Sequence, residues 1–154
     1  MRFDLDGVEI RVKRNHACRL AGFALQTVTD NRRRHDELQR FMLTTDSVTV
    51  AVEVPIFLST DEMNALQRKY GLNHPDAPLS AVTGHIDFLQ IRNGAIHVLD
   101  YKPGARHEKP IAQLMVYALA LSMRTGLSLF DFVCAWFDAE GYFEFYPRHV
   151  VKKR

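Results

Sequence analysis

The dipeptide Asn93-Gly94 stands between two apolar runs and is the strongest local signal in the sequence. It predicts a β-hairpin with a two-residue turn, because both central residues of such a turn must adopt positive φ. Counting outward from the turn places Leu89 opposite Val98, and Asp87 opposite Asp100. The predicted register therefore brings two carboxylates face to face, with Cβ atoms about 4.5–5.5 Å apart.

Lys102 follows Asp100 by two residues, so the alternation of a strand directs its side chain to the face that carries both acids. Opposed carboxylates repel each other unless a cation lies between them, and unpaired buried charge is costly. One interpretation is a divalent metal held by Asp87 and Asp100 with Lys102 beside it. The other is a solvated sheet edge with a surface ion pair, which contributes about 0–1 kcal/mol.

The length and composition of the chain indicate what kind of protein contains this hairpin. A chain of 154 residues with 47% apolar and 25% charged side chains predicts one globular domain over residues 1–154. Cys18 and Cys134 are far apart and belong to no C-x-x-C pattern, so we expect buried, reduced thiols and no iron–sulfur cluster or structural zinc. No apolar run is long enough to span a membrane and the N-terminus lacks a signal-peptide pattern, so we expect a soluble, cytoplasmic protein without a membrane partner.

The net charge of +2 is less informative than its clustering. Clusters of basic residues neutralise phosphates and favour nucleic-acid binding, although each one alone is also compatible with an ordinary solvated face. The clusters are Arg11 with Lys13 and Arg14, Arg32–Arg34, and Arg148 with Lys152–Arg154.

Hydrophobic periodicity and capping signals predict the other elements. They are a short hairpin over Phe3–Val12, a helix over Asp30–Leu43, a strand over Ser47–Leu58, a helix from the Ser59-x-x-Glu62 capping box to near Gly71, a loop over Leu72–Leu79, a helix over His107–Thr125 that stops at Gly126, and strands over Asp131–Asp138 and Tyr142–Tyr146. With the hairpin, the core order is αβββαβ, which predicts an α/β (α+β) fold with a mixed central β-sheet flanked by helices.

Three short motifs, in this order, resemble those of a known family. Gly84-His85-Ile86-Asp87 is a G-x-x-D element, Leu99–Gly104 is similar to a hydrophobic-D-Y-K-x-G element, and Gln113-x-x-x-Tyr117 is similar to a Q-x-x-x-Y element. Together they resemble the PD-(D/E)XK nuclease superfamily, and within it the RecB-like exonuclease branch. The motifs cover roughly Glu53 to Tyr117, and the resemblance implies a restriction-endonuclease-like core.

The resemblance implies a metal-dependent nuclease that hydrolyses DNA phosphodiester bonds. Asp87 and Asp100 would bind one or two Mg²⁺ or Mn²⁺ ions, and Lys102 would assist the attacking water. The main-chain carbonyl of Tyr101 would join the metal ligands if the strand is locally distorted. Gln113 and Tyr117, one helical turn apart, would contact a phosphate or orient Lys102; the alternative is a buried polar partner and a core aromatic residue.

RecB-like members take a further ligand from the helix before the first strand, and His35 is the candidate here. It shares a helix face with Leu38 and Met42, which is also where a core histidine would lie. An imidazole ligand favours manganese over magnesium, so we predict preferential activation by manganese. Glu53 is the rival ligand, and we favour for it an indirect role through a hydrogen bond.

The sequence also departs from the family. It lacks the cysteine set that some RecB-like exonucleases use for an iron–sulfur cluster, and it lacks a Walker-type loop, so we expect a stand-alone nuclease domain with DNA as its partner. A homo-oligomer or partner proteins of DNA repair and recombination fit this expectation. Two alternatives stay open: a non-catalytic nucleic-acid-binding or assembly subunit with the same fold, and an RNA-processing nuclease.

Overall fold

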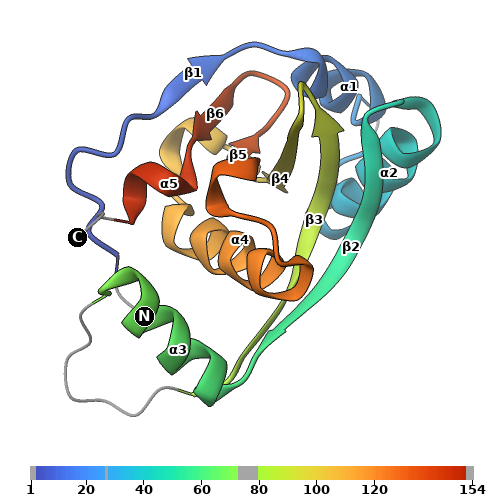
Figure 1. Ribbon diagram of the computed structural model, residues 1–154. Coiled ribbons are helices and arrows are strands. Elements are labelled where there is room, and N and C mark those ends of the chain that lie inside the picture. The colour runs from blue at the N-terminus through green and yellow to red at the C-terminus, as the bar shows by residue number, and fades with distance from the viewer. Residues whose placement is uncertain (1–2, 27, 73–79, 152–154) are drawn as a thin grey trace.

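A computed structural model describes residues 3–26, 28–72 and 80–151 (Figure 1). The loop predicted over Leu72–Leu79 lies outside the described residues except for Leu72, and so does the basic segment Lys152–Arg154. The elements in chain order are β1 (Arg11–Lys13), α1 (His16–Ala24), α2 (Asn31–Thr45), β2 (Thr49–Leu58), α3 (Thr60–Tyr70), β3 (Val82–Arg92), β4 (Ala95–Tyr101), η1 (Ala105–His107), α4 (Ile111–Thr125), η2 (Leu129–Asp131), β5 (Phe132–Phe137), β6 (Tyr142–Phe145) and α5 (Pro147–Val150).

The strands form one mixed sheet in the order β1-β6-β5-β4-β3-β2. Neighbouring strands are antiparallel except β4 and β5, which run parallel and are connected through α4. Helix α4 covers one face of the sheet, and α1 and α2 cover the other (Figure 1). This architecture confirms the predicted α/β class and is consistent with a restriction-endonuclease-like core.

Each face of the sheet has its own apolar core. The α4-side core joins Leu114, Met115 and Ala118 of α4 to sheet residues that include Val98 and Trp136. The α2-side core joins helix residues Ala17, Leu38 and Met42 to Phe88, Leu99, Tyr101 and Phe137 of the sheet. The two cores fix the positions of α2 and of the β3–β4 hairpin relative to each other.

Several local predictions are confirmed. The hairpin turn has positive φ at Asn93 and Gly94, and the β3–β4 register runs from Arg92↔Ala95 to Phe88↔Leu99 as counted from the sequence. Asp30 caps α2 through the Arg32 amide. The capping box of α3 forms between Ser59 and Glu62.

Other predictions are wrong. The helix predicted from His107 begins only at Ile111, because Gly104 adopts a left-handed conformation, residues 105–107 form a 3₁₀ turn and Pro110 takes the N-cap position. The segment Phe3–Val12 forms no hairpin, since Arg11–Lys13 pairs with β6 at the other end of the sequence. Helix α1 was not expected, although Asn15 caps its first turn.

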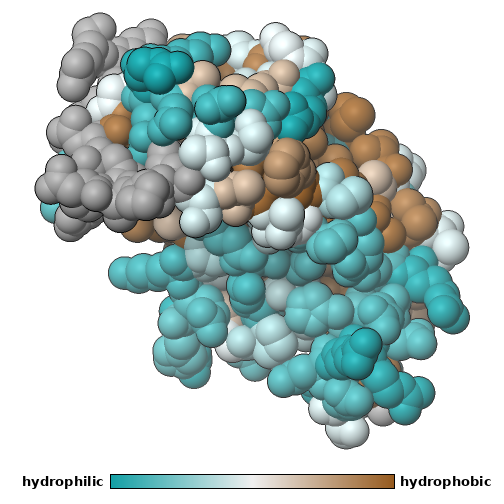
Figure 2. Space-filling model, turned by 90° about the horizontal axis from the view of Figure 1, so that it is seen from below, coloured by the Kyte–Doolittle hydropathy of each residue, from teal (hydrophilic) through white to brown (hydrophobic). Residues whose placement is uncertain are grey.

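Hydrophilic side chains cover most of the surface that Figure 2 shows, and apolar side chains gather toward one side of it. Within the described part of the chain, no helix is long and apolar enough to cross a membrane. Both Cys18 and Cys134 are buried free thiols, as expected.

Candidate active site

The β3–β4 hairpin opens where the sequence places its two acids. The outermost pair of its ladder joins Phe88 to Leu99, and the next residues outward are Asp87 and Asp100. Beyond this point the amide of Tyr101 no longer pairs with a strand carbonyl; it donates to Asp87 Oδ2 at 2.9 Å. A carboxylate oxygen thus replaces the sheet partner, so the backbone amide is satisfied while the two strands separate.

A distortion in the adjacent strand accompanies this opening. Glu53 of β2 has φ +50°, a left-handed conformation that is uncommon for a non-glycine residue. The β2–β3 ladder has Val52↔Phe88 on one side of this position and Val54↔Ile86 on the other. Val52 and Phe88 pack in the α2-side core whereas Val54 and Ile86 pack in the α4-side core, so both strands reverse their faces here.

His35 reaches the opened hairpin from α2. Its Nε2 atom lies 3.1 Å from the Tyr101 carbonyl oxygen and 3.5 Å from Asp87 Oδ2, and its ring meets the Tyr101 ring edge-on. The other ring nitrogen, Nδ1, lies 3.3 Å from the Asn31 carbonyl oxygen. The structure therefore brings together His35, both acids and the Tyr101 carbonyl, which come from three separate elements.

The carboxyl groups of Asp87 and Asp100 have pKa values that are shifted in opposite directions. Burial raises the pKa of Asp100, and the neighbouring Asp87 carboxylate raises it further, because two buried acids in contact do not ionise together readily. Burial also opposes ionisation of Asp87, but hydrogen bonds from His35, from Asp100 and from the Tyr101 amide outweigh it and hold the pKa of Asp87 below its usual value. Its contact with Asp87 in turn raises the pKa of His35 to about 9, despite partial burial.

Lys102 completes the charged cluster. Its Nζ atom lies 3.1 Å from Asp100 Oδ2, and its amide donates to the Phe137 carbonyl, which holds the residue beside the end of β5. The Lys102 side chain is 30% exposed, whereas that of Asp100 is 7% exposed. The ammonium thus lies between the buried acid and solvent, where an incoming ligand would arrive.

Gln39 is a site residue that sequence reasoning missed. Its side-chain amide donates both to Glu53 Oε1, at 2.6 Å, and to the Asp87 carbonyl oxygen, at 3.2 Å. Gln39 is buried and lies one turn after His35 on α2, which is the spacing that could have indicated it. Glu53 itself is exposed and is linked to the acids through Gln39.

Gln113 and Tyr117 of α4 form a separate pair near the start of β3. Gln113 donates to the Tyr117 hydroxyl at 2.8 Å. A Cβ atom at Gly84 would lie 3.0 Å from the Tyr117 ring, so this ring packs directly on the glycine backbone. The hydrogen bonds of the described residues include none between this pair and Lys102.

The cluster has the donors that a divalent cation requires, although the described residues hold no set of three His, Cys, Asp or Glu side chains arranged as a finished metal site. Asp100 Oδ2 is buried and accepts no hydrogen bond, so one acidic oxygen is left for another cation beside its ion pair with Lys102. His35 Nε2 faces Asp87 and the Tyr101 carbonyl, and a proton bound to it would leave when the ring ligates a metal. Carboxylate, imidazole and carbonyl groups together suit manganese or magnesium.

The comparisons agree with this geometry. A family model described as the PD-(D/E)XK nuclease superfamily matches residues 10–132. The chain therefore belongs to the PD-(D/E)XK nuclease superfamily. No curated protein matches it.

Proposed function

We propose that this chain is a divalent-metal-dependent deoxyribonuclease of the RecB-like branch. The observation that carries the proposal is the convergence of Asp87, Asp100, Lys102 and His35 at the open end of the β3–β4 hairpin. Such an arrangement costs stability, because it gathers partly buried like charges that a purely structural sheet end has no reason to keep. Membership in a nuclease superfamily supports phosphodiester hydrolysis as the reaction of this cluster.

Asp87, Asp100, His35 and the Tyr101 carbonyl would hold the metal. A bound divalent cation supplies a water of lowered pKa and stabilises negative charge on phosphate oxygens. Lys102 holds a positive charge next to the reacting phosphate and orients a water by hydrogen bonding, while Asp100 fixes the ammonium in place. Gln39 acts through Asp87 and Glu53 as a positioning residue, since it touches only the acids' supporting groups.

Two features favour the RecB-like assignment and a preference for manganese. The Gln113–Tyr117 pair lies over Gly84, three residues before Asp87, so a strand bound along β3 would meet it. His35 gives the ligand set an imidazole, which manganese accepts more readily than magnesium does. Replacing Gln113 with Ala should slow cleavage without changing metal binding.

The decisive experiment compares cleavage of end-labelled linear and closed circular DNA, single- and double-stranded, with magnesium or manganese, beside matched RNA. We expect manganese-dependent cleavage of DNA that is abolished in Asp100→Ala and Lys102→Ala. The control is Arg33→Gln, a charge change on the exposed face of α2 that should leave cleavage unchanged.

Undiminished cleavage by Asp100→Ala or Lys102→Ala would reject the assignment of the site. Cleavage of RNA alone would mean that the substrate is RNA and not DNA. Absence of cleavage, together with absence of manganese binding by calorimetry, would favour a non-catalytic binding subunit. Circular dichroism of each variant shows whether the fold survives the substitution.

A further inference from the structure

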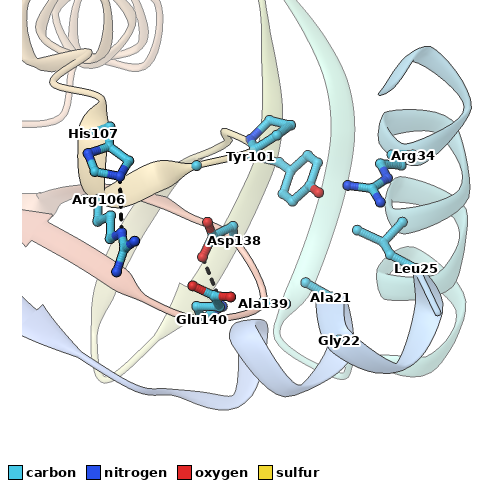
Figure 3. A pocket seen from close by; sticks show the side chains of 12 residues that line it. Ala21, Gly22, Leu25, Arg34, Tyr101, Arg106, His107, Asp138, Ala139 and Glu140 are labelled. Atoms are coloured by element: carbon cyan, nitrogen blue, oxygen red, sulfur yellow. Dashed lines mark hydrogen bonds between the residues drawn. The ribbon is translucent and has the colours of Figure 1, made fainter. Parts of the chain in front are cut away.

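A cavity of about 370 Å³ adjoins the charged cluster (Figure 3). It lies between α1, the start of α2, the segment after β4 and the turn between β5 and β6. Tyr101 belongs to both places, because its carbonyl faces His35 while its side chain lines the cavity. Pro103 and Gly104 form the next part of the wall, so the cavity begins within a residue of Lys102.

The charges that line the cavity are not suited to binding a simple anion. Two arginines, Arg34 and Arg106, are balanced by two carboxylates, Asp138 and Glu140, so the formal charge of the lining is close to zero. Asp138 is already occupied, since it accepts from the amides of Ala105, Glu140 and Gly141. A free phosphate would bind only weakly here, because the two carboxylates in the lining offset the attraction of the two arginines.

A flat, neutral group with both donors and acceptors fits the same lining. Arg34 lies beside the Tyr101 hydroxyl and offers donors, and Glu140 offers an acceptor from the opposite wall (Figure 3). Between them the floor is formed by small or apolar side chains, Ala21, Gly22, Leu25 and Ala139. Ligand pockets typically occupy about 300–1,000 Å³, so this volume suits a group the size of a nucleoside.

We propose that this cavity holds the base of one unstacked nucleotide of the substrate strand while the phosphodiester beside it lies at Asp87 and Asp100. The inference rests on the proposed function and adds a base-binding subsite to it, with Arg34, Glu140 and the floor around Ala139 as its contacts. A base inside a duplex cannot enter such a cavity without leaving its stack. The substrate strand is therefore unpaired at the nucleotide next to the cut.

The test measures binding without metal, so that no cleavage occurs. Fluorescence anisotropy in EDTA compares a short labelled single-stranded DNA oligonucleotide with an abasic strand of the same length and charge. We expect the wild type to bind the strand with bases about tenfold more tightly, which is the scale of one well-held base. Ala139→Trp, which fills the cavity floor, should bind both strands equally, at the level of the abasic strand.

A second variant and a control keep the test sharp if Ala139→Trp folds poorly. Arg34→Gln should reduce the advantage of the strand with bases by at least half, whereas Arg33→Gln, its exposed neighbour on α2, should leave that advantage unchanged. Equal affinity of the wild type for both strands would overturn the subsite, and so would an undiminished base preference in Ala139→Trp and Arg34→Gln.

Failure of the subsite is separable from failure of the proposed nuclease. Metal-dependent cleavage by the wild type, with no base preference in EDTA, would leave the nuclease standing and remove the cavity from it. A base preference that depends on Ala139, without any cleavage, would support the subsite in a protein that binds nucleic acid but does not cut it.

Discussion

At the scale of single residues, the acidic pair is placed for cation binding at the expense of stability. Asp100 is buried against Asp87, and one of its oxygens accepts no hydrogen bond. Relieving such a pair is a recurrent way to stabilise a protein while removing its activity.

Asp100→Asn should therefore stabilise the metal-free protein by about 1 kcal/mol and abolish manganese binding. The reason is that an amide keeps the shape of the carboxyl group without its charge. Urea unfolding in EDTA at pH 8 measures the first effect, and calorimetry with manganese the second. Asp36→Asn, on the exposed face of α2, is the matched control. A clear loss of stability in Asp100→Asn would show that its ion pair with Lys102 outweighs the repulsion.

Gly84 is constrained by its neighbour on α4. A Cβ atom there would meet the Tyr117 ring at 3.0 Å and the hydroxyl at 3.1 Å, closer than ordinary contact. Gly84→Ala should cost about 1–3 kcal/mol, because the buried ring must shift. In the Tyr117→Leu background the same change should cost much less, and a double-mutant cycle by urea unfolding measures the difference. Additive costs would mean that the ring is not the obstacle.

At the scale of elements, α2 is tied to the sheet by one buried side chain. Gln39 spans Glu53 of β2 and the Asp87 carbonyl of β3, at the point where both strands reverse their faces. This contact joins the strained residue of β2 to the acid of β3, so α2 stabilises the distortion from which the site is made.

Gln39→Leu keeps the volume of the side chain but removes both hydrogen bonds. We expect a loss of about 1–3 kcal/mol in the free energy of unfolding, because the partly buried Asp87 carbonyl is left without this donor. In the proposed nuclease, cleavage should fall more than DNA affinity does, since Gln39 touches no substrate. Gln39→Glu, which also removes both donated hydrogen bonds and places a carboxylate against Glu53, should lose at least as much stability as Gln39→Leu. Unchanged stability in both would mean that water replaces the amide.

The same elements show what the sequence was able to predict. The Asn93-Gly94 turn determines the hairpin register, because both residues adopt the positive φ that a two-residue turn requires. Asp30 and Ser59 mark the starts of two helices, because their side chains accept hydrogen bonds from nearby backbone amides. The reversal at Glu53 was not predictable, because alternation of side chains assumes regular backbone and no glycine marks the left-handed residue. Gln39 was missed for the same reason, since its partners meet only through that distortion.

At the scale of the whole molecule, a second polar cluster joins strands at the hairpin-turn end of the sheet, away from the acids. Arg92 of β3 donates to the Tyr142 hydroxyl of β6 at 2.6 Å and lies 3.3 Å from His97 Nδ1 of β4. Lys13 of β1 pairs with the buried Glu144 of β6 at 2.8 Å. Four strands thus depend on the charge state of this cluster.

His97 makes the stability of this arrangement depend on pH. Burial and the nearby Arg92 guanidinium together lower the pKa of His97 to about 4, although the Glu144 carboxylate opposes them, while an unfolded chain titrates near 6.5. Between these values the unfolded chain binds a proton that the folded chain does not, so stability falls as pH decreases from about 6.5 toward 4, by up to about 1.4 kcal/mol per pH unit. His35 acts with the opposite sign at higher pH, because its raised pKa of about 9 gives stability that is lost as pH rises from 6.5 through 9.

His97→Gln isolates the first effect, because the amide accepts from Arg92 but does not titrate. The difference in free energy of unfolding between wild type and variant, from urea titrations at half-unit intervals between pH 4 and 8, should change with pH only below about 6.5, with the variant gaining relative stability as pH falls. All other titrating groups, including His35 and the acids, cancel in this difference as long as they lie far from His97. A difference that stays constant across the range would mean that His97 titrates alike in the folded and unfolded chain and that the four strands do not require its neutral form.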